Sequence, residues 1–158
     1  MPDFDILNLK DTLSPPKNTK TVGQTGENLA ARFLARRGLR LVCSNFKVPI
    51  GRNRRGAAVT GEIDLVALDG RTLCFIEVKT RSSDEFAAPL SAVDLRKQRQ
   101  IIRTARVYRK IFNLSGIKYR YDAVGIVLGE AGRTKIEYFE NFWQEEKFRK
   151  KVWNDELY

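Results

Sequence analysis

The chain has 158 residues, of which 42% are hydrophobic and 10% aromatic, a composition typical of one globular domain with a buried core. Its 29 Lys and Arg outnumber 19 Asp and Glu, and the formal net charge of +10 favours a polyanionic partner, nucleic acid before an anionic membrane. Because histidine is absent, a Ser-His-Asp triad, a histidine-containing zinc site and a histidine general base are all excluded.

The N-terminal segment, residues 1–22, is predicted to be a poorly ordered arm. It contains Pro15-Pro16 and shows no sustained hydrophobic period. It also lacks the basic and then apolar pattern of a signal peptide, and no apolar run approaches the ~18 residues of a membrane span. We therefore expect a cytoplasmic protein without a membrane partner. Cys43 and Cys74 lack metal-ligand spacing and are expected to be reduced, half-buried strand residues.

A helix, a strand and a basic loop are predicted next. The helix begins at the N-cap Thr25 and ends at Gly38, with an apolar stripe of Leu29, Ala30, Phe33 and Leu34. Residues 39–48 have the composition of a strand. Residues 49–60, PIGRNRRGAAVT, contain no acid and predict a mobile loop. Its arginines either contact nucleic-acid phosphates, which we favour, or are merely solvated; they are Arg52, Arg54 and Arg55.

Residues 61–80, GEIDLVALDGRTLCFIEVKT, predict a β-hairpin. Two apolar-alternating runs flank Asp69-Gly70, a dipeptide that favours a two-residue turn. In that register Asp64 faces Phe75, and Glu62 faces Glu77. Since directly opposed residues share a face, the charged side chains of Asp64, Glu77 and Lys79 project from one side, close together at the open end. The other side is expected to hold the apolar set Ile63, Leu65, Ala67, Cys74, Ile76 and Val78.

This set of charges predicts a metal site. Two carboxylates about 7–8 Å apart at the backbone can converge on one cation, and Mg²⁺ or Mn²⁺ prefers oxygen ligands. A lysine on the same face can orient an attacking water or stabilise the charge that develops on a phosphate. Metal-assisted phosphodiester hydrolysis requires these groups. The alternative is an ordinary salt bridge at an exposed strand end.

The second half of the chain predicts one helix and two strands. A linker follows the hairpin, and Ser91 with Asp94 indicates a helix start. The helix is expected from Ala92 to about Phe112, with an apolar face formed by Ile101, Ile102, Ala105, Tyr108 and Phe112. Its seven Lys and Arg residues between 96 and 110 either face nucleic acid or are solvated. Strands are expected at 119–129 and 134–142, and a short charged helix in the tail.

The motifs together resemble a known family. GEIDLVALDG…CFIEVKTR, preceded by GENLAARFLARRGLRLV and followed by AVDLRKQRQIIRTARVYRK and YRYDAVGIV, resembles bacterial YraN-type proteins. These belong to the PD-(D/E)xK nuclease superfamily and are similar to archaeal Holliday-junction resolvases. The resemblance covers roughly residues 23–127. Residues 51–60 look longer than is usual in the family, and the segments 1–22 and 140–158 lie outside it.

The resemblance implies a fold and a site. The fold is restriction-endonuclease-like, an α/β fold with a mixed central β-sheet flanked by helices. We expect this domain at residues 23–143, followed by a charged extension at residues 144–158. Asp64, Glu77 and Lys79 match the catalytic signature, and Glu27 matches the acid on the first helix. Asp64, Glu77 and Glu27 would then be the metal ligands. Glu27 has an alternative role, because an acid in a first helical turn complements the helix dipole.

Three further residues are open at this point. Lys97 and Gln98 stand early in the second predicted helix, where they would either reach a substrate phosphate or simply be solvated. Asp122 would be either a further acid near the site or a capping residue at a strand end.

The expected activity is that of a metal-dependent DNA endonuclease, acting on branched or otherwise structured DNA. The main alternative is a nucleic-acid-binding module that keeps the nuclease fold and cleaves little, and a membrane or protein adaptor is a third. A cutter of symmetric junctions needs two sites, so by analogy alone we expect a homodimer.

Overall fold

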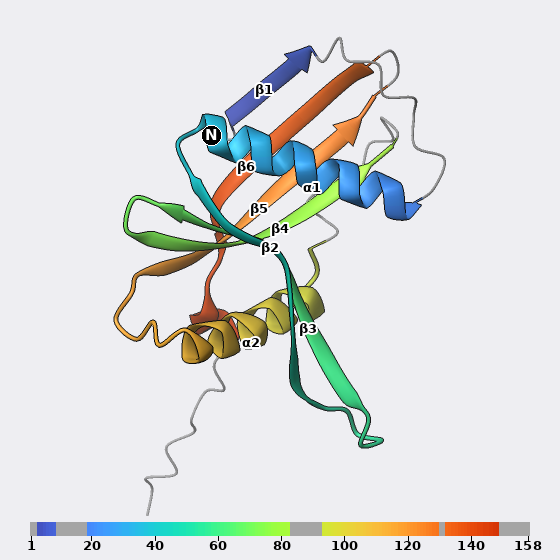
Figure 1. The fold of residues 1–158 in the computed structure, drawn as a ribbon. Coiled ribbons are helices and arrows are strands. Elements are labelled where there is room, and N and C mark those ends of the chain that lie inside the picture. Colours follow the sequence, from blue (N-terminus) through green and yellow to red (C-terminus); the bar gives the residue numbers. More distant parts are fainter. Residues whose placement is uncertain (1–2, 9–18, 83–92, 130–131, 149–158) are drawn as a thin grey trace, which may run out of the picture.

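The computed structural model describes residues 3–8, 19–82, 93–129 and 132–148, with side chains from residue 22 onward. The elements in chain order are β1 (Asp3–Asn8), α1 (Thr19–Arg36), β2 (Arg40–Arg52), β3 (Ala58–Asp69), β4 (Thr72–Arg81), α2 (Leu95–Ile111), β5 (Tyr119–Leu128), β6 (Arg133–Trp143) and the 3₁₀ helix η3 (Glu145–Phe148). The strands form one six-stranded sheet in the order β1-β6-β5-β4-β3-β2 (Figure 1). Among the described strands, β4 and β5 alone pair in parallel. The predicted restriction-endonuclease-like α/β fold is confirmed.

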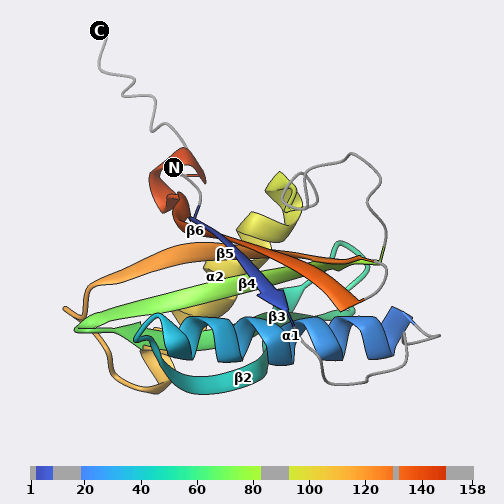
Figure 2. The ribbon, with the colours of Figure 1, turned by 90° about the horizontal axis from the view of Figure 1, so that it is seen from above.

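Each face of the sheet buries its own hydrophobic core, because side chains alternate between the faces along each strand. Helix α1 covers one face, where its Phe33 and Leu34 pack with Ile76 of β4 and Val124 of β5. Helix α2 covers the other face (Figures 1 and 2). There Ile101 and Ala105 pack with a second set, Val66, Phe75, Tyr121 and Trp143. The parallel pair β4–β5, joined through α2, therefore lies between two helical layers.

The prediction for the N-terminal segment is wrong in two places. Residues 3–8 form β1, which pairs antiparallel with β6, whereas the sequence predicts an arm without regular structure. Helix α1 begins at Thr19, so Thr25 lies inside the helix and is not its N-cap. A six-residue edge strand is defined by its partner strand more than by a local pattern, and Gly23 weakens the helical pattern of the first turns.

The predicted loop at residues 49–60 is also wrong, because β2 and β3 continue through it as a paired hairpin. Residues 46–52 pair with residues 58–63, and the arm, defined as residues 46–63, extends beyond the sheet past α2 (Figure 1). Its turn is built on Asn53, whose Oδ1 accepts hydrogen bonds from the backbone N–H of Arg55 at 2.9 Å and of Ala57 at 3.0 Å. An asparagine side chain that bonds its own backbone in this way favours a turn.

The remaining elements follow the predictions with smaller changes. Asp94 caps α2 by accepting a hydrogen bond from the Lys97 backbone N–H at 2.8 Å, and the predicted apolar face is buried except for Phe112, which is 53% exposed. The helix ends at Ile111, one residue before it. Of the predicted tail helix only η3 is described, and Ser91, part of the predicted start of the second helix, lies outside the described residues. Both cysteines are free thiols; Cys74 is buried and Cys43 partly exposed. Within the described ranges, no helix combines the length and apolarity of a membrane span.

Candidate active site at the fork between β3 and β4

The β3–β4 hairpin has a different register from the predicted one. Its turn is Gly70-Arg71, because Asp69 pairs with Thr72, and Gly70 has a φ of 57° at the first central position, as a type II′ turn requires. Opposed residues therefore shift by two, and Val66, not Asp64, faces Phe75. A shift of two residues does not by itself move a side chain to the other face. Asp64 and Glu77, which lie at the fork where β3 and β4 separate, therefore stay together. Ile63 packs in the core on the α2 side, contrary to the prediction.

The two strands separate at Asp64. The β3–β4 ladder ends at the pair Leu65–Ile76, and beyond it β3 leaves β4 and continues into the arm. Oδ2 of Asp64 accepts a hydrogen bond from the backbone N–H of Val78 at 2.8 Å. The carboxylate thus takes the place that a strand carbonyl would occupy, and this bond fixes Asp64 at the fork.

Glu77 lies at the centre of the fork. It is 1% exposed, and its Oε1 lies 2.8 Å from Nζ of Lys79, which comes from the same face of β4. Its Oε2 lies 3.5 Å from Nζ of Lys97 on α2, but this oxygen has no hydrogen-bond partner among the described residues. The structure therefore brings together two of the predicted acids and two of the predicted lysines.

The electrostatics of the fork show that its carboxylates are crowded. Burial, and then the neighbouring Glu77 carboxylate, raise the pKa of Asp64 to about 8. Burial lowers the pKa of Lys79, but the charge of Glu77 and the hydrogen bond to it outweigh burial, so that this pKa lies above its ordinary value. Lys79 is therefore a charged ammonium and can donate hydrogen bonds but cannot accept a proton.

The pair of carboxylates fits a hard divalent cation. The two acids are buried and adjacent, and one oxygen of Glu77 receives no hydrogen bond from the described residues. A bound cation would relieve both the crowding of the two charges and the unsatisfied oxygen. Mg²⁺ is commonly held by one or two carboxylates and keeps several waters. Among the described residues, no group of three or more carboxylates or thiols could hold one metal ion. The protein ligands that the geometry supports are thus Asp64 and Glu77.

Glu27 does not complete a three-carboxylate shell with that pair, contrary to the predicted ligand set. It lies in the third turn of α1, so the helix-dipole alternative also loses its basis. The preceding residue, Gly26, packs directly on Thr80 of β4, where a Cβ would collide with the threonine hydroxyl. Glu27 is therefore held next to the β4 segment that follows Lys79. Its Oε2 is buried without a hydrogen-bond partner in the described part of the chain.

The side chains of Gln98 and Asp122 are buried and bonded to other groups of the protein. The Gln98 amide is buried, donates to the Val93 carbonyl at 2.9 Å and lies 3.5 Å from Nζ of Lys147, which favours a structural role over the predicted phosphate contact. Asp122 is 0% exposed and accepts hydrogen bonds from Arg120 and from the Tyr138 hydroxyl. It belongs to the α1 face of the sheet, opposite the fork. Asp122 is therefore a structural residue and not a further acid of the site.

Comparison with known protein families matches residues 26–126 to the family described as "Uncharacterised protein family UPF0102". The chain belongs to UPF0102. This family, which the resemblance to YraN-type proteins indicated, lies in the PD-(D/E)xK nuclease-like superfamily. The matched range runs from α1 into β5 and includes the fork, the arm and α2.

Curated UPF0102 proteins are similar to this chain over most of their length. The one from Chlorobium chlorochromatii is 36% identical over 140 residues, which cover 85% of this chain and 100% of the relative. That from Caldanaerobacter subterraneus subsp. tengcongensis is 40% identical over 111 residues, or 70% and 83% of the two chains. That from Prosthecochloris aestuarii is 40% identical over 130 residues, or 78% and 94%.

The basic residues of the UPF0102 arm divide into two kinds. Arg52 donates through Nη1 to the Gly56 carbonyl at 2.7 Å, so its guanidinium helps to close the turn. Arg54 and Arg55 lie exposed at the tip. Two residues of α2 for which the sequence predicts no specific contact hold the arm to that helix. Gln100 donates to the Thr60 carbonyl at 3.1 Å, and Arg103 donates to the Ile50 carbonyl. These contacts join residues 40 and 53 positions apart, and no local pattern signals them.

Proposed function

We propose that the chain is a metal-dependent endonuclease that hydrolyses phosphodiester bonds of DNA at the fork, with branched or otherwise structured DNA as its substrate. The observation that carries this proposal is the buried pair of Asp64 and Glu77, with the Lys79 ammonium 2.8 Å from Glu77. Membership in UPF0102 and the net charge of +10 support it.

Each residue of the fork would have a distinct role. Asp64 and Glu77 would hold Mg²⁺ or Mn²⁺, which when bound neutralises phosphate charge and lowers the pKa of a water. The Val78 N–H fixes Asp64, and Glu77 fixes the Lys79 ammonium. That ammonium would donate to the attacking water or to a phosphate oxygen, where it stabilises the charge that grows in the transition state. Lys97, on the first turn of α2, would contact a phosphate of the substrate.

A cleavage assay with the full chain tests this proposal. We expect product on at least one of four labelled DNA forms, duplex, single strand, flap and four-way junction, in Mg²⁺ or Mn²⁺. EDTA should abolish it, because neither lysine can replace the cation. No product on any form with either metal would contradict the proposal.

The alternative, a DNA-binding module with little cleavage, is favoured by one observation. Both ammonium groups of the fork contact Glu77, so that protein cations already neutralise part of the charge that would attract a metal ion. Tight DNA binding without cleavage in the same assay would support this alternative.

The arm tip yields a binding prediction. Arg54→Ala with Arg55→Ala should weaken binding to all DNA sequences alike, because phosphate contacts carry no base information. Each lost contact should flatten the slope of log affinity against log salt by about 0.9 on duplex DNA. Fluorescence anisotropy at several salt concentrations measures both effects, and leaving Arg52 in place keeps the turn intact. An unchanged slope would show that the tip is only solvated.

A further inference from the structure

A basic groove lies between the arm and the first turns of α2, next to the fork. It has a volume of about 420 Å³, and its lining includes Ile50 and Val59 of the arm and Arg96, Lys97, Arg99 and Arg103 of α2. The arginines of this groove are exposed. Because the Lys97 ammonium lies 3.5 Å from Glu77, the groove begins at the proposed active site.

The groove has fixed walls. Gln100 and Arg103 donate hydrogen bonds to the backbone carbonyls of Thr60 and Ile50 on opposite strands of the arm. Gly61 sits directly against Thr104, and a Cβ at Gly51 would lie 2.7 Å from Nη2 of Arg103. The close approach to Thr104 requires glycine at position 61, and the φ of 140° favours glycine at position 51, so that the arm and α2 are built to pack against each other.

The lining of the groove points to a phosphate backbone as its ligand. The one acid among its described lining residues, Asp94, has its carboxylate engaged in capping α2. The described lining residues include two aliphatic side chains and no aromatic one. Single-stranded nucleic acid is usually bound by stacking its bases on aromatic side chains. Duplex DNA, whose bases are already stacked, needs only cations and hydrogen-bond donors along its backbone.

We propose that this groove binds the sugar–phosphate backbone of double-stranded DNA on one side of the scissile phosphate. The substrate would then carry a duplex segment next to the cut, held between the arm and α2 by Arg96, Arg99 and Arg103. The inference rests on the proposed function only for the position of the cut, since binding to the groove requires no hydrolysis.

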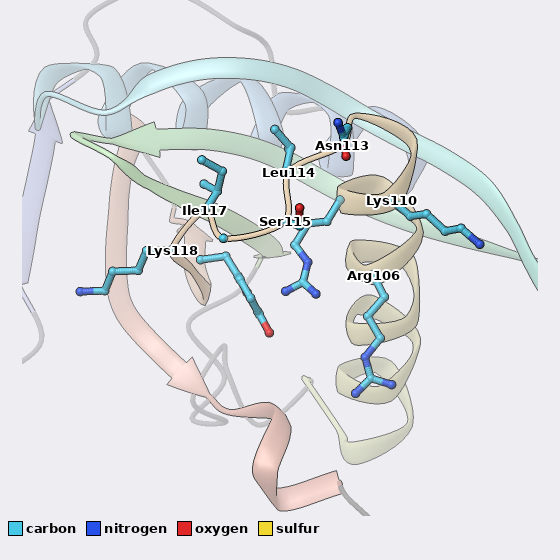
Figure 3. A pocket seen from close by; sticks show the side chains of 10 residues that line it. Arg106, Lys110, Asn113, Leu114, Ser115, Ile117 and Lys118 are labelled. Carbon is cyan, nitrogen blue, oxygen red and sulfur yellow. The ribbon is translucent and has the colours of Figure 1, made fainter.

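A second basic hollow provides a matched control. It has a volume of about 780 Å³ and lies between the end of α2 and residues 113–118, about 20 Å along the helix from Lys97 at 1.5 Å per residue. Figure 3 shows that Lys110 and Lys118, which line it, point away from each other. Their charges do not converge on one ligand, and the hollow is not adjacent to the carboxylates of Asp64 and Glu77.

The test compares two charge-matched double variants. Both are made in an Asp64→Asn background, so that DNA is bound without being cut. The groove variant is Arg96→Gln with Arg99→Gln, and the control is Lys110→Gln with Lys118→Gln. Affinity for a labelled duplex and for a single strand of the same length is measured by anisotropy across a salt series, after circular dichroism has shown that all variants are folded.

We expect the parent to prefer duplex over single strand. The groove variant should lose about 1.8 from the duplex salt slope, for two contacts of about 0.9 each, and the control should lose much less. Preference for single strand, an unchanged slope in the groove variant, or an equal loss in the control would overturn the inference. Because the readout is binding, a protein that behaves as expected here but never cleaves DNA contradicts the proposed function alone.

Discussion

Asp64→Asn and Lys79→Met should each lower metal-dependent cleavage at least about 100-fold while leaving DNA affinity nearly unchanged. Asp64 supplies one of two carboxylates at the fork, and asparagine keeps its shape without the charge that holds a cation. Lys79 supplies an ammonium 2.8 Å from Glu77, and methionine keeps a chain of similar length without the charge. Neither residue would supply the main electrostatic attraction for DNA, which would come from the other basic residues of the chain.

Single-turnover cleavage and anisotropy on the same DNA separate the two effects. Glu62→Gln is a suitable control, because Glu62 lies on β3 two residues before Asp64 but pairs with Lys47 at 3.3 Å and is 36% exposed. It should cleave within about twofold of the parent. Cleavage by Asp64→Asn or Lys79→Met at more than a tenth of the parent rate would show that the chemistry occurs elsewhere.

Asp122→Ala should lower the free energy of unfolding by about 3–5 kcal/mol, because it breaks a buried ion pair and leaves its partners uncompensated. The carboxylate is 0% exposed, accepts from Nε of Arg120 at 3.0 Å and from the Tyr138 hydroxyl at 2.7 Å, and also bonds the Asn141 backbone N–H at 2.8 Å. These bonds join β5 to β6 at the irregular register between Tyr121 and Ala123. Urea unfolding followed by tryptophan fluorescence measures the loss.

The matched control for that prediction is Asp69→Ala. Asp69 contacts the same guanidinium, with Oδ2 2.9 Å from Nη1 of Arg120. Its side chain is 42% exposed, and exposed pairs contribute at most about 1 kcal/mol. A second comparison is Asp64→Asn, which should not lower the free energy of unfolding, since it removes a charge that burial and Glu77 disfavour. A loss for Asp122→Ala no larger than that of Asp69→Ala would contradict the structural role.

The fork could be predicted from the sequence because it depends only on which face of the hairpin each side chain occupies, and not on the exact register. Asp64, Glu77 and Lys79 stay on one side of the hairpin whether the turn is Asp69-Gly70 or Gly70-Arg71, since the two registers differ by two residues. The alternation of apolar residues along β3 and β4 defines the buried faces regardless of the turn. A shift of one residue would have reversed every side chain and removed the site.

The features that the sequence did not predict depend on contacts between distant segments. The basic residues at 52–55 have loop composition, yet β2 and β3 pair through the arm, and Gln100 and Arg103 of α2 hold the paired strands by bonding their backbone. Strand β1 depends on pairing with β6, more than 120 positions later. Gln98 has the polar side chain of a solvated helix position, but its surroundings, Val93 and Lys147, bury it. None of these contacts leaves a periodic signal in the local sequence.

Direct measurement of metal binding tests the central claim, that the fork holds a divalent cation on Asp64 and Glu77. Mn²⁺ added to the full chain can be followed by electron paramagnetic resonance of the unbound ion, for the parent and for Asp64→Asn, Glu77→Gln and the control Glu62→Gln. We predict one Mn²⁺ site per chain in the parent and in the control, and loss of that site in both fork variants. Equal Mn²⁺ binding by the parent and both fork variants would contradict the account.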